Sequence, residues 1–231
     1  MKTIGILGGM SAASTQTYYR ELCNLTRARL GGLHSPELLI RSLDFATIEA
    51  LQMRGEWAAA GAILNHEAKA LERGGAQLII LATNTMHKLA NQMMIGVSVP
   101  FIHIADATAR AINHRGLRSP GLMATAFTMK EAFYTDRLIA AGLKPILPDV
   151  ADQAEIHRII YEELCKDITT DESSAAYIAV AKRLAESGAD SLILGCTEVG
   201  MLLNQGNVAI PVFDTTLIHC AAALDWALAR S

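Results

Sequence analysis

The chain has 231 residues, enough for one large domain or two small ones that each bury a core. Apolar residues make up 51% of it, which excludes a disordered chain. Its 20 basic and 23 acidic residues give a net charge of −3 and form no basic run, which argues against a nucleic-acid partner.

Short apolar stretches alternate with amphipathic segments along the whole chain. Strands are expected at residues 3–9, 37–45, 76–83, 100–105 and 120–125. Helices are expected at 11–32, 57–75, from about 85, and through 106–115. Alternation of this kind predicts an α/β fold with mainly parallel sheets.

The first residues, MKTIGILGGMS, hold an apolar stretch too short for the core of a signal peptide. No apolar run approaches the ~18–20 residues that cross a bilayer. We therefore expect a soluble, cytoplasmic protein without a membrane partner.

The four cysteines have no paired spacing, and the chain contains no CxxC or HExxH motif, so no metal site is expected. In the cytosol these thiols are expected to stay reduced. Three are expected to act as small buried hydrophobic residues, and Cys196 is the candidate for chemistry. The cysteines are Cys23, Cys165, Cys196 and Cys220.

The chain also repeats itself. The segment GGAQLIILATNT aligns with SGADSLILGCTE, so that Thr83 pairs with Cys196 at an offset of 113 residues. Pro100 pairs with Pro211 at an offset of 111 and Tyr19 with Tyr134 at 115. A duplicated α/β domain accounts for the three nearly equal offsets. We expect a discontinuous first domain, residues 1–98 with 210–231, and a second domain at 99–209.

Thr83 and Cys196 each follow an apolar strand and precede an expected helix. Ligands of open parallel sheets bind beyond the carboxyl ends of the strands, and a helix start favours an anion and lowers a thiol pKa. Two facing halves would therefore place these side chains on opposite sides of one ligand carbon. A substrate carboxylate would rest on the N–H groups around Asn84-Thr85 and Thr197-Glu198, which would also stabilise a carbanion.

Five motifs, GILGGMS, TNTMH, PFIHIADAT, GCTE and PVFDTT, together resemble the aspartate/glutamate racemase family. The resemblance runs over about residues 3–228. It implies two pseudo-symmetric α/β/α domains, each with a mainly parallel sheet, and an active site with two facing cysteines at the cleft between them. It also implies a homodimer that needs no pyridoxal phosphate or other cofactor. Cys196 matches the second cysteine, whereas Thr83 stands in place of the first.

The Thr83 hydroxyl does not usefully ionise near pH 7 but can donate a proton. The hypothesis is therefore a racemase of aspartate or glutamate in which Cys196 is the base and Thr83 a donor on the far face. Such an enzyme would turn over one enantiomer, expected to be L, far more readily than the other.

Further substrate contacts are suggested by position. Met10 and Ser11 would line the pocket through the resemblance, with the preceding glycines bringing the backbone close to the ligand. Gln52 and Arg54 follow the second strand, where the family places groups that recognise the substrate side chain. Lys166 is similar in position to a basic residue of some members. Other contacts are Asn84, Thr85, His87, Thr197 and Glu198, where His87 would orient Thr83 and Glu198 would accept the thiol proton or the substrate ammonium.

Other functions remain open from the residues. A single productive cysteine also suits an arylmalonate decarboxylase-like or maleate isomerase-like enzyme, which would protonate one face after bond cleavage. A binding protein that has lost catalysis is a third possibility, with the hydroxyl at residue 83 as the trace of that loss. A hydantoin racemase is the fourth, less favoured because TNTMH and GILGGMS resemble the amino-acid branch.

Overall fold

The computed structural model describes residues 1–166 and 168–229 and divides the chain into two compact units. Unit 1 comprises Met1–His103 with His219–Ser231, and unit 2 comprises Ile104–Ile218. The return to unit 1 lies later than the expected residue 210, because strand β6 (Val212–Asp214) pairs with a strand of unit 2. The chain returns to unit 1 within helix α10 (Thr215–Leu228), at His219.

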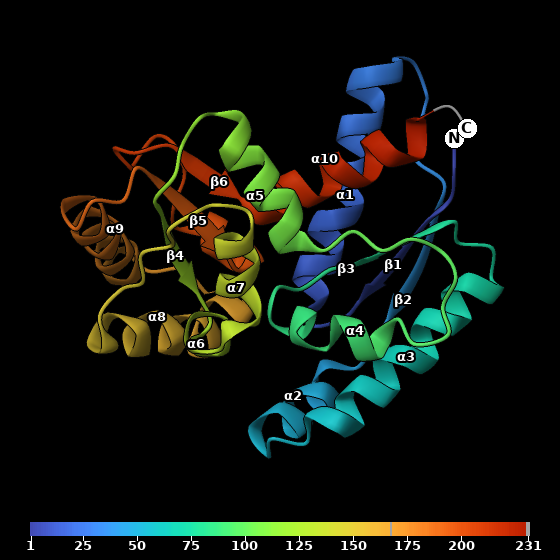
Figure 1. Cartoon of the computed structure of the whole chain (residues 1–231), viewed down its shortest axis with the longest axis horizontal. Helices are drawn as coiled ribbons and strands as arrows, with labels where there is room; N and C mark the ends of the chain where they lie inside the picture. The colour runs from blue at the N-terminus through green and yellow to red at the C-terminus, as the bar shows by residue number, and fades with distance from the viewer. Residues whose placement is uncertain (167, 230–231) are drawn as a thin grey trace. The chain divides into compact units, whose positions relative to one another are not determined.

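Unit 1 is built on a parallel three-stranded sheet in the order β2-β1-β3 (Figure 1). The strands are β1 (Ile4–Gly8), β2 (Leu38–Ser42) and β3 (Leu78–Leu81). The helices between them are α1 (Ala12–Leu30), α2 (Phe45–Met53) and α3 (Trp57–Arg73). A short 3-10 helix, η1 (Thr85–Leu89), and α4 (Ala90–Met93) follow β3.

Helices cover both faces of this sheet because successive strand residues point to opposite faces. Ile4, Ile6 and Leu78 pack with residues of α1 and α10 in one apolar cluster. Leu7 and Ile79 pack with residues of α2, α3 and η1 in another. Strands β1 and β3 are thus buried on both sides, as their continuous apolar residues predict, whereas the edge strand β2 is largely exposed.

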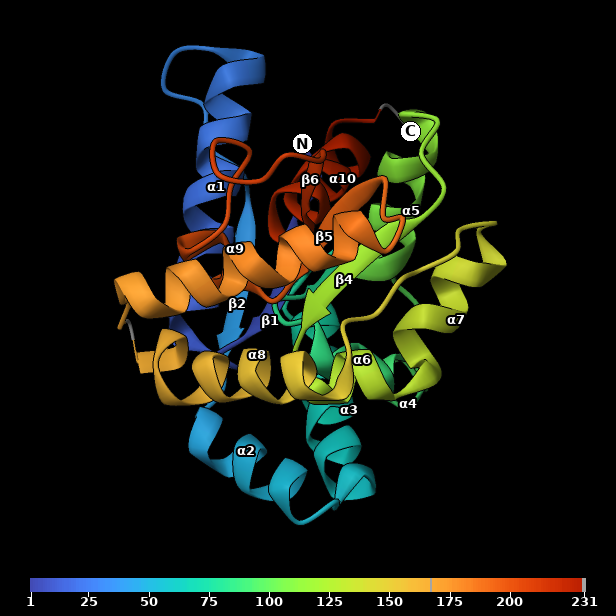
Figure 2. The same ribbon diagram turned by 90° about the vertical axis from the view of Figure 1, so that its left-hand side faces the viewer.

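Unit 2 is built on a second parallel sheet, in the order β4-β5-β6, with strands β4 (Pro120–Ala124) and β5 (Ser191–Gly195) beside β6. Helices α8 (Val150–Glu162) and α9 (Asp171–Glu186) both contact β4 (Figure 2). The others are α5 (Ile104–His114), α6 (Ala126–Lys130) and α7 (Ala132–Ala140). Two 3-10 helices, η2 (Leu164–Lys166) and η3 (Thr197–Met201), complete the unit.

The two sheets have the same strand order once two single bridges are included. Phe101 bridges β3 in unit 1, and Ile146 bridges β4 in unit 2. Each unit therefore places four extended segments in one order, with β1 equivalent to β4 and β3 to β5. This agrees with the repeat in the sequence and gives two pseudo-symmetric α/β units.

The structure contradicts the prediction of a strand at residues 100–105. The segment makes one bridge at Phe101, and helix α5 already begins at Ile104. No helix among residues 1–166 and 168–229 is long and apolar enough to cross a membrane.

Candidate functional site

The first group of candidate side chains follows β1 and β2 in unit 1. Met10 is buried among apolar residues, and the Ser11 hydroxyl accepts a hydrogen bond from the N–H of Ser14 at 3.2 Å, which caps helix α1. Gly9 has a positive φ of 87°, and a Cβ there would meet the backbone N and O of Leu43 at 2.2 Å. The backbone at Gly9 was expected to approach the ligand closely, but in the structure it packs closely against the backbone that follows β2.

Gln52 lies on α2 with only 4% of its surface exposed. Its Nε2 donates to the sulfur of Met86 at 2.8 Å, and its Oε1 has no hydrogen-bond partner among the described residues. A buried acceptor without a donor is costly, so this oxygen is suited to a donor that a ligand brings.

Thr83, partly buried, follows β3 at its carboxyl end and leads into η1. Asn84, Thr85 and His87 are all buried. The His87 Nδ1 lies 2.7 Å from the carbonyl oxygen of Thr83, and because a carbonyl only accepts, Nδ1 carries the proton. The His87 ring is thus hydrogen-bonded to the backbone of the turn at Thr83.

Three buried imidazoles lie next to one another in unit 1. The rings of His87 and His103 are 4.5 Å apart, and those of His87 and His219 are 5.7 Å apart. The Tyr18 hydroxyl lies 2.8 Å from His219 Nδ1, while His219 Nε2 donates to the Ile102 carbonyl at 2.9 Å. Burial, with the nearby charges of His103 and His219, lowers the pKa of His87 well below its ordinary value, so that this histidine is neutral near pH 7.

In unit 2, Cys196 lies between the end of β5 and the start of η3, and Glu198 lies two residues beyond it in η3. The Cys196 thiol donates to the Glu198 carboxylate with an S···O distance of 3.0 Å, and the Thr197 hydroxyl donates to the same oxygen. Glu198 is only 5% exposed. A thiol and a buried carboxylate in direct contact can exchange a proton.

The pKa of the Cys196 thiol is raised well above its ordinary value, first by burial and then by the charge and hydrogen bond of Glu198. The expectation that a helix start lowers this pKa is wrong. The helix that follows Cys196 is a five-residue 3-10 helix, and η1 after Thr83 is equally short. Few aligned peptide dipoles act on either residue, and burial beside a carboxylate outweighs them.

Replacing Glu198 with glutamine is expected to lower the pKa of Cys196, because the charge and the carboxylate acceptor that raise it are both removed. Only the thiolate reacts with iodoacetamide, so alkylation of the wild type should accelerate only above the ordinary thiol pKa. In Glu198→Gln the rise should begin at lower pH and make alkylation at pH 8 severalfold faster. Peptide mapping by mass spectrometry measures the rate at Cys196.

The matched control is Glu186→Gln, which removes an exposed carboxylate that pairs with Lys182 at 3.8 Å. Its alkylation profile should follow the wild type. A profile in Glu198→Gln that does not move, or moves to higher pH, would show that Glu198 does not hold the thiol in its neutral form.

Two other candidates lie at the surface. Arg54 ends α2, is exposed, and pairs with Glu56 at 2.7 Å, which raises the arginine pKa. The guanidinium that was expected to recognise the substrate side chain is thus paired with a carboxylate of this chain. Lys166 ends η2 and is exposed.

Two residues near Cys196 carry no signal in the sequence. Burial and the charge of Glu198 raise the pKa of Cys165 to about 12, and Cys165 in turn contributes to the raised pKa of Cys196. Tyr177 on α9 is buried, and its pKa is raised by burial and by the nearby Cys196. Both come from segments distant in sequence, so spacing could not identify them.

A cavity of about 650 Å³ in unit 2 is bounded by α5, β6 and the segment after η3. Leu194, Gly200 and Asp214 line it, but Cys196 does not. The thiol–carboxylate pair, rather than this cavity, carries the groups that can move a proton. Within residues 1–166 and 168–229, no three His, Cys, Asp or Glu side chains are placed to hold a metal ion.

Comparisons with known proteins agree with this architecture. The family model for Asp/Glu/Hydantoin racemase matches residues 7–223. A Yersinia pestis protein named provisionally as an Asp/Glu racemase has 44% identity and a TM-score of 0.93, over 99% of this chain and 100% of that one. An aspartate racemase homologue from Pyrococcus horikoshii OT3 has 36% identity and a TM-score of 0.86, over 98% and 99%. The broad specificity amino-acid racemase RacX of Bacillus subtilis (strain 168) is 24% identical over 221 residues, 92% of each chain.

Proposed function

The chain belongs to the Asp/Glu/hydantoin racemase family, a family of isomerase-type enzymes, and from this premise we propose that it racemises aspartate, glutamate or both. The reaction needs no pyridoxal phosphate and uses Cys196 with Thr83 in place of a pair of thiols. The protein acts as a homodimer in the cytoplasm.

The hydrogen bond from Cys196 to Glu198 is the observation that supports this proposal most directly. The thiol is neutral in the free protein because burial and Glu198 raise its pKa. The positive ammonium group of an amino acid would favour the thiolate, and Glu198 is placed to take the thiol proton. Cys196 then becomes the base that removes the Cα proton of the substrate.

Thr83 has the complementary role on the opposite face of the Cα carbon. Its hydroxyl donates a proton to the carbanion, directly or through a water, and His87 fixes its backbone through the 2.7 Å bond to the Thr83 carbonyl. Because a hydroxyl is a poor base near pH 7, the enantiomer that presents its Cα proton to Thr83 reacts slowly.

The remaining candidates bind the substrate in this proposal. The backbone N–H groups around Asn84-Thr85 and Thr197-Glu198 hold the carboxylate at Cα and stabilise the charge that develops on it. The Oε1 of Gln52 suits the substrate ammonium, since it is a buried acceptor that finds no donor among the residues that the structure describes. Lys166 takes the distal carboxylate.

The two enantiomers have equal free energy, which limits how far the enzyme can favour one direction. Because the equilibrium constant between the enantiomers is therefore 1, kcat/KM must be equal for the L and D substrates, but the two kcat values can differ greatly. The Thr83–Cys196 pair is therefore expected to give a high kcat for one enantiomer, with a high KM, and low values of both for the other.

Loss of the α-proton in D₂O tests the function. The protein is incubated with each enantiomer of aspartate, glutamate and alanine, exchange is followed by proton NMR, and chirality is read by chiral chromatography. We expect exchange with inversion of an acidic amino acid, faster from the L form at saturating substrate. Heat-denatured protein is the control for uncatalysed exchange.

Each other result points elsewhere. Exchange without inversion means that the substrate is deprotonated and reprotonated on the same face. No exchange of any amino acid contradicts the racemase, and consumption of an arylmalonate or maleate would then identify a decarboxylase or isomerase. Amino-acid binding without exchange would identify a binding protein.

A further inference from the structure

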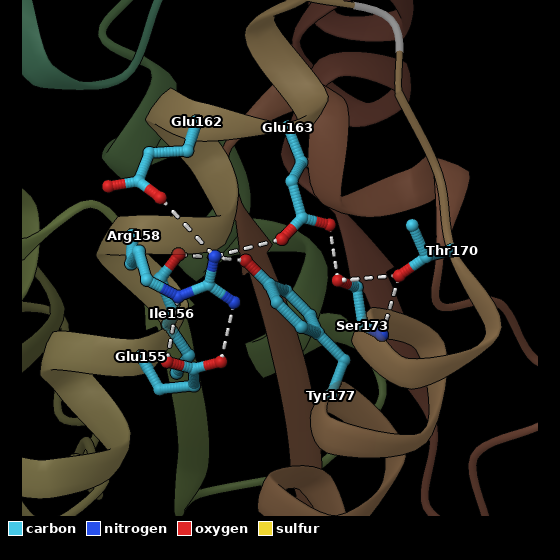
Figure 3. A network of polar contacts seen from close by, with 8 residues as sticks. All are labelled: Glu155, Ile156, Arg158, Glu162, Glu163, Thr170, Ser173 and Tyr177. Atoms are coloured by element: carbon cyan, nitrogen blue, oxygen red, sulfur yellow. Dashed lines mark hydrogen bonds and ion pairs between the residues drawn. The ribbon is translucent and has the colours of Figure 1, made fainter.

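The segment that joins α8 to α9 carries Cys165 and Lys166 and starts at a network of charges around Arg158 (Figure 3). The Arg158 guanidinium donates to Glu155 at 2.8 and 3.0 Å, to Glu163 at 3.0 Å and to Glu162 at 3.4 Å. These three carboxylates raise the pKa of Arg158. The arginine therefore stays charged and can hold all three.

Glu163 differs from the other two carboxylates in burial and in what it joins. Its side chain is 16% exposed, compared with 45% for Glu155 and 64% for Glu162. One of its oxygens accepts from Arg158 and the other from the hydroxyl of Ser173 in the first turn of α9 (Figure 3). Glu155 makes two hydrogen bonds with Arg158, but the Glu163 contact is less screened by water because its carboxylate is more buried.

The backbone of Glu163 closes the turn that follows it. Glu163 directly follows the last residue of α8 and caps the helix, and its carbonyl accepts from the N–H of Lys166 at 2.8 Å and of Ile168 at 3.1 Å. Leu164 anchors the turn in the core with 1% of its surface exposed. Side chain and main chain of Glu163 thus fix the position of η2 together.

The turn also lies against the segment that carries the thiol–carboxylate pair. Helix η2 contacts η3, which begins directly after Cys196. The charge of Glu198 raises the pKa of Cys165, and both Cys196 and Glu163 contribute to the raised pKa of Tyr177. A shift of η2 would therefore move Cys165 and Lys166 relative to Cys196 and Glu198.

We propose that Glu163 is a positioning residue that, through Arg158 and Ser173, holds η2 against the Cys196 segment and thereby sets the affinity for the distal carboxylate of the substrate. The substrate part of this proposal rests on the proposed function, in which Lys166 contacts that carboxylate. The structural part does not, because it concerns only how η2 is held.

Amide hydrogen exchange tests the structural part without any activity. In Glu163→Ala, the amides of residues 164–166 and 168–170 should exchange about tenfold faster, since charge-assisted bonds to a carboxylate that restrained the turn are lost. Glu162→Ala is the matched control: it removes the neighbouring carboxylate from the same arginine but no contact with Ser173, and should exchange like the wild type. Ser173→Ala, which keeps every charge, should reproduce a smaller part of the effect.

Substrate affinity tests the second part. In Glu163→Ala the KM for L-glutamate should rise about fivefold while kcat changes less than about twofold, as expected for loss of a contact present in both ground and transition states. Binding of L-alanine, which lacks a distal carboxylate, should not change. Glu163→Asp should recover part of the affinity.

The failure of this proposal differs from failure of the proposed function. Equal amide exchange in Glu163→Ala and Glu162→Ala would overturn the positioning role, whatever the activity. Faster exchange with unchanged glutamate affinity would overturn the role in substrate binding. If the wild type does not turn over any amino acid, the glutamate affinity measured by calorimetry replaces KM. An equal affinity in Glu163→Ala and Glu162→Ala would then overturn the role of Glu163 in substrate binding.

Discussion

Cys196→Ala is expected to lower the rate of α-proton exchange from glutamate or aspartate by at least about 10³-fold, because in the proposed function Cys196 is the base on that face. The Glu198 carboxylate remains in this variant, but the proposal gives it no direct contact with Cα. The loss should appear in kcat for both enantiomers. NMR in D₂O with saturating substrate measures it.

Two variants separate this loss from a general disturbance. Cys196→Ser leaves a hydroxyl at both residue 83 and residue 196, and should be almost as inactive as Cys196→Ala because neither group ionises near pH 7. Cys23→Ala removes a partly buried thiol of unit 1 and should keep full activity. Retention of more than about a tenth of the wild-type rate in Cys196→Ala would exclude Cys196 as the base.

Thr83→Cys is expected to raise kcat for the slower enantiomer by about 10²-fold, since a thiol can ionise in the range where a hydroxyl cannot. The two kcat values should then become similar, while kcat/KM stays equal in the two directions of each protein. Initial rates from pure L and pure D substrate, followed by chiral chromatography, provide the comparison. The effect is large because the substitution supplies a second base.

Thr83→Ser serves as the reference for this change because it keeps the hydroxyl and removes one methyl group. It should retain the unequal kcat values of the wild type. If Thr83→Cys leaves the ratio of the two kcat values unchanged, the hydroxyl at residue 83 is not what limits the slow direction. Equal kcat values in the wild type itself would contradict the proposal more directly.

Much of the fold follows from local patterns in the chain. The apolar runs at 76–83 and 120–125 contain the buried strands β3 and β4, because parallel strands covered on both faces need continuous apolar residues. The helices expected at 11–32 and 57–75 are α1 and α3. The repeat also predicted that the two units would share one topology.

Local patterns did not predict features that depend on residues distant in the sequence. Residues 100–105 have the composition of a strand, but only Phe101 pairs with β3 before α5 begins. The segments after Thr83 and Cys196 were expected as helices with useful dipoles and are short 3-10 helices. Local periodicity does not determine how far an edge segment pairs or how many turns a helix completes.

The sequence by itself determined the α/β class, the duplication and the pairing of Thr83 with Cys196, because each is written in the order and spacing of residues along the chain. Only the tertiary structure decided that the pKa of the Cys196 thiol is raised, that Cys165 and Tyr177 lie near it, and that Glu163 joins α8 to α9. A pKa and a hydrogen bond depend on burial and on neighbouring charges, which segments far apart in the sequence supply when they pack.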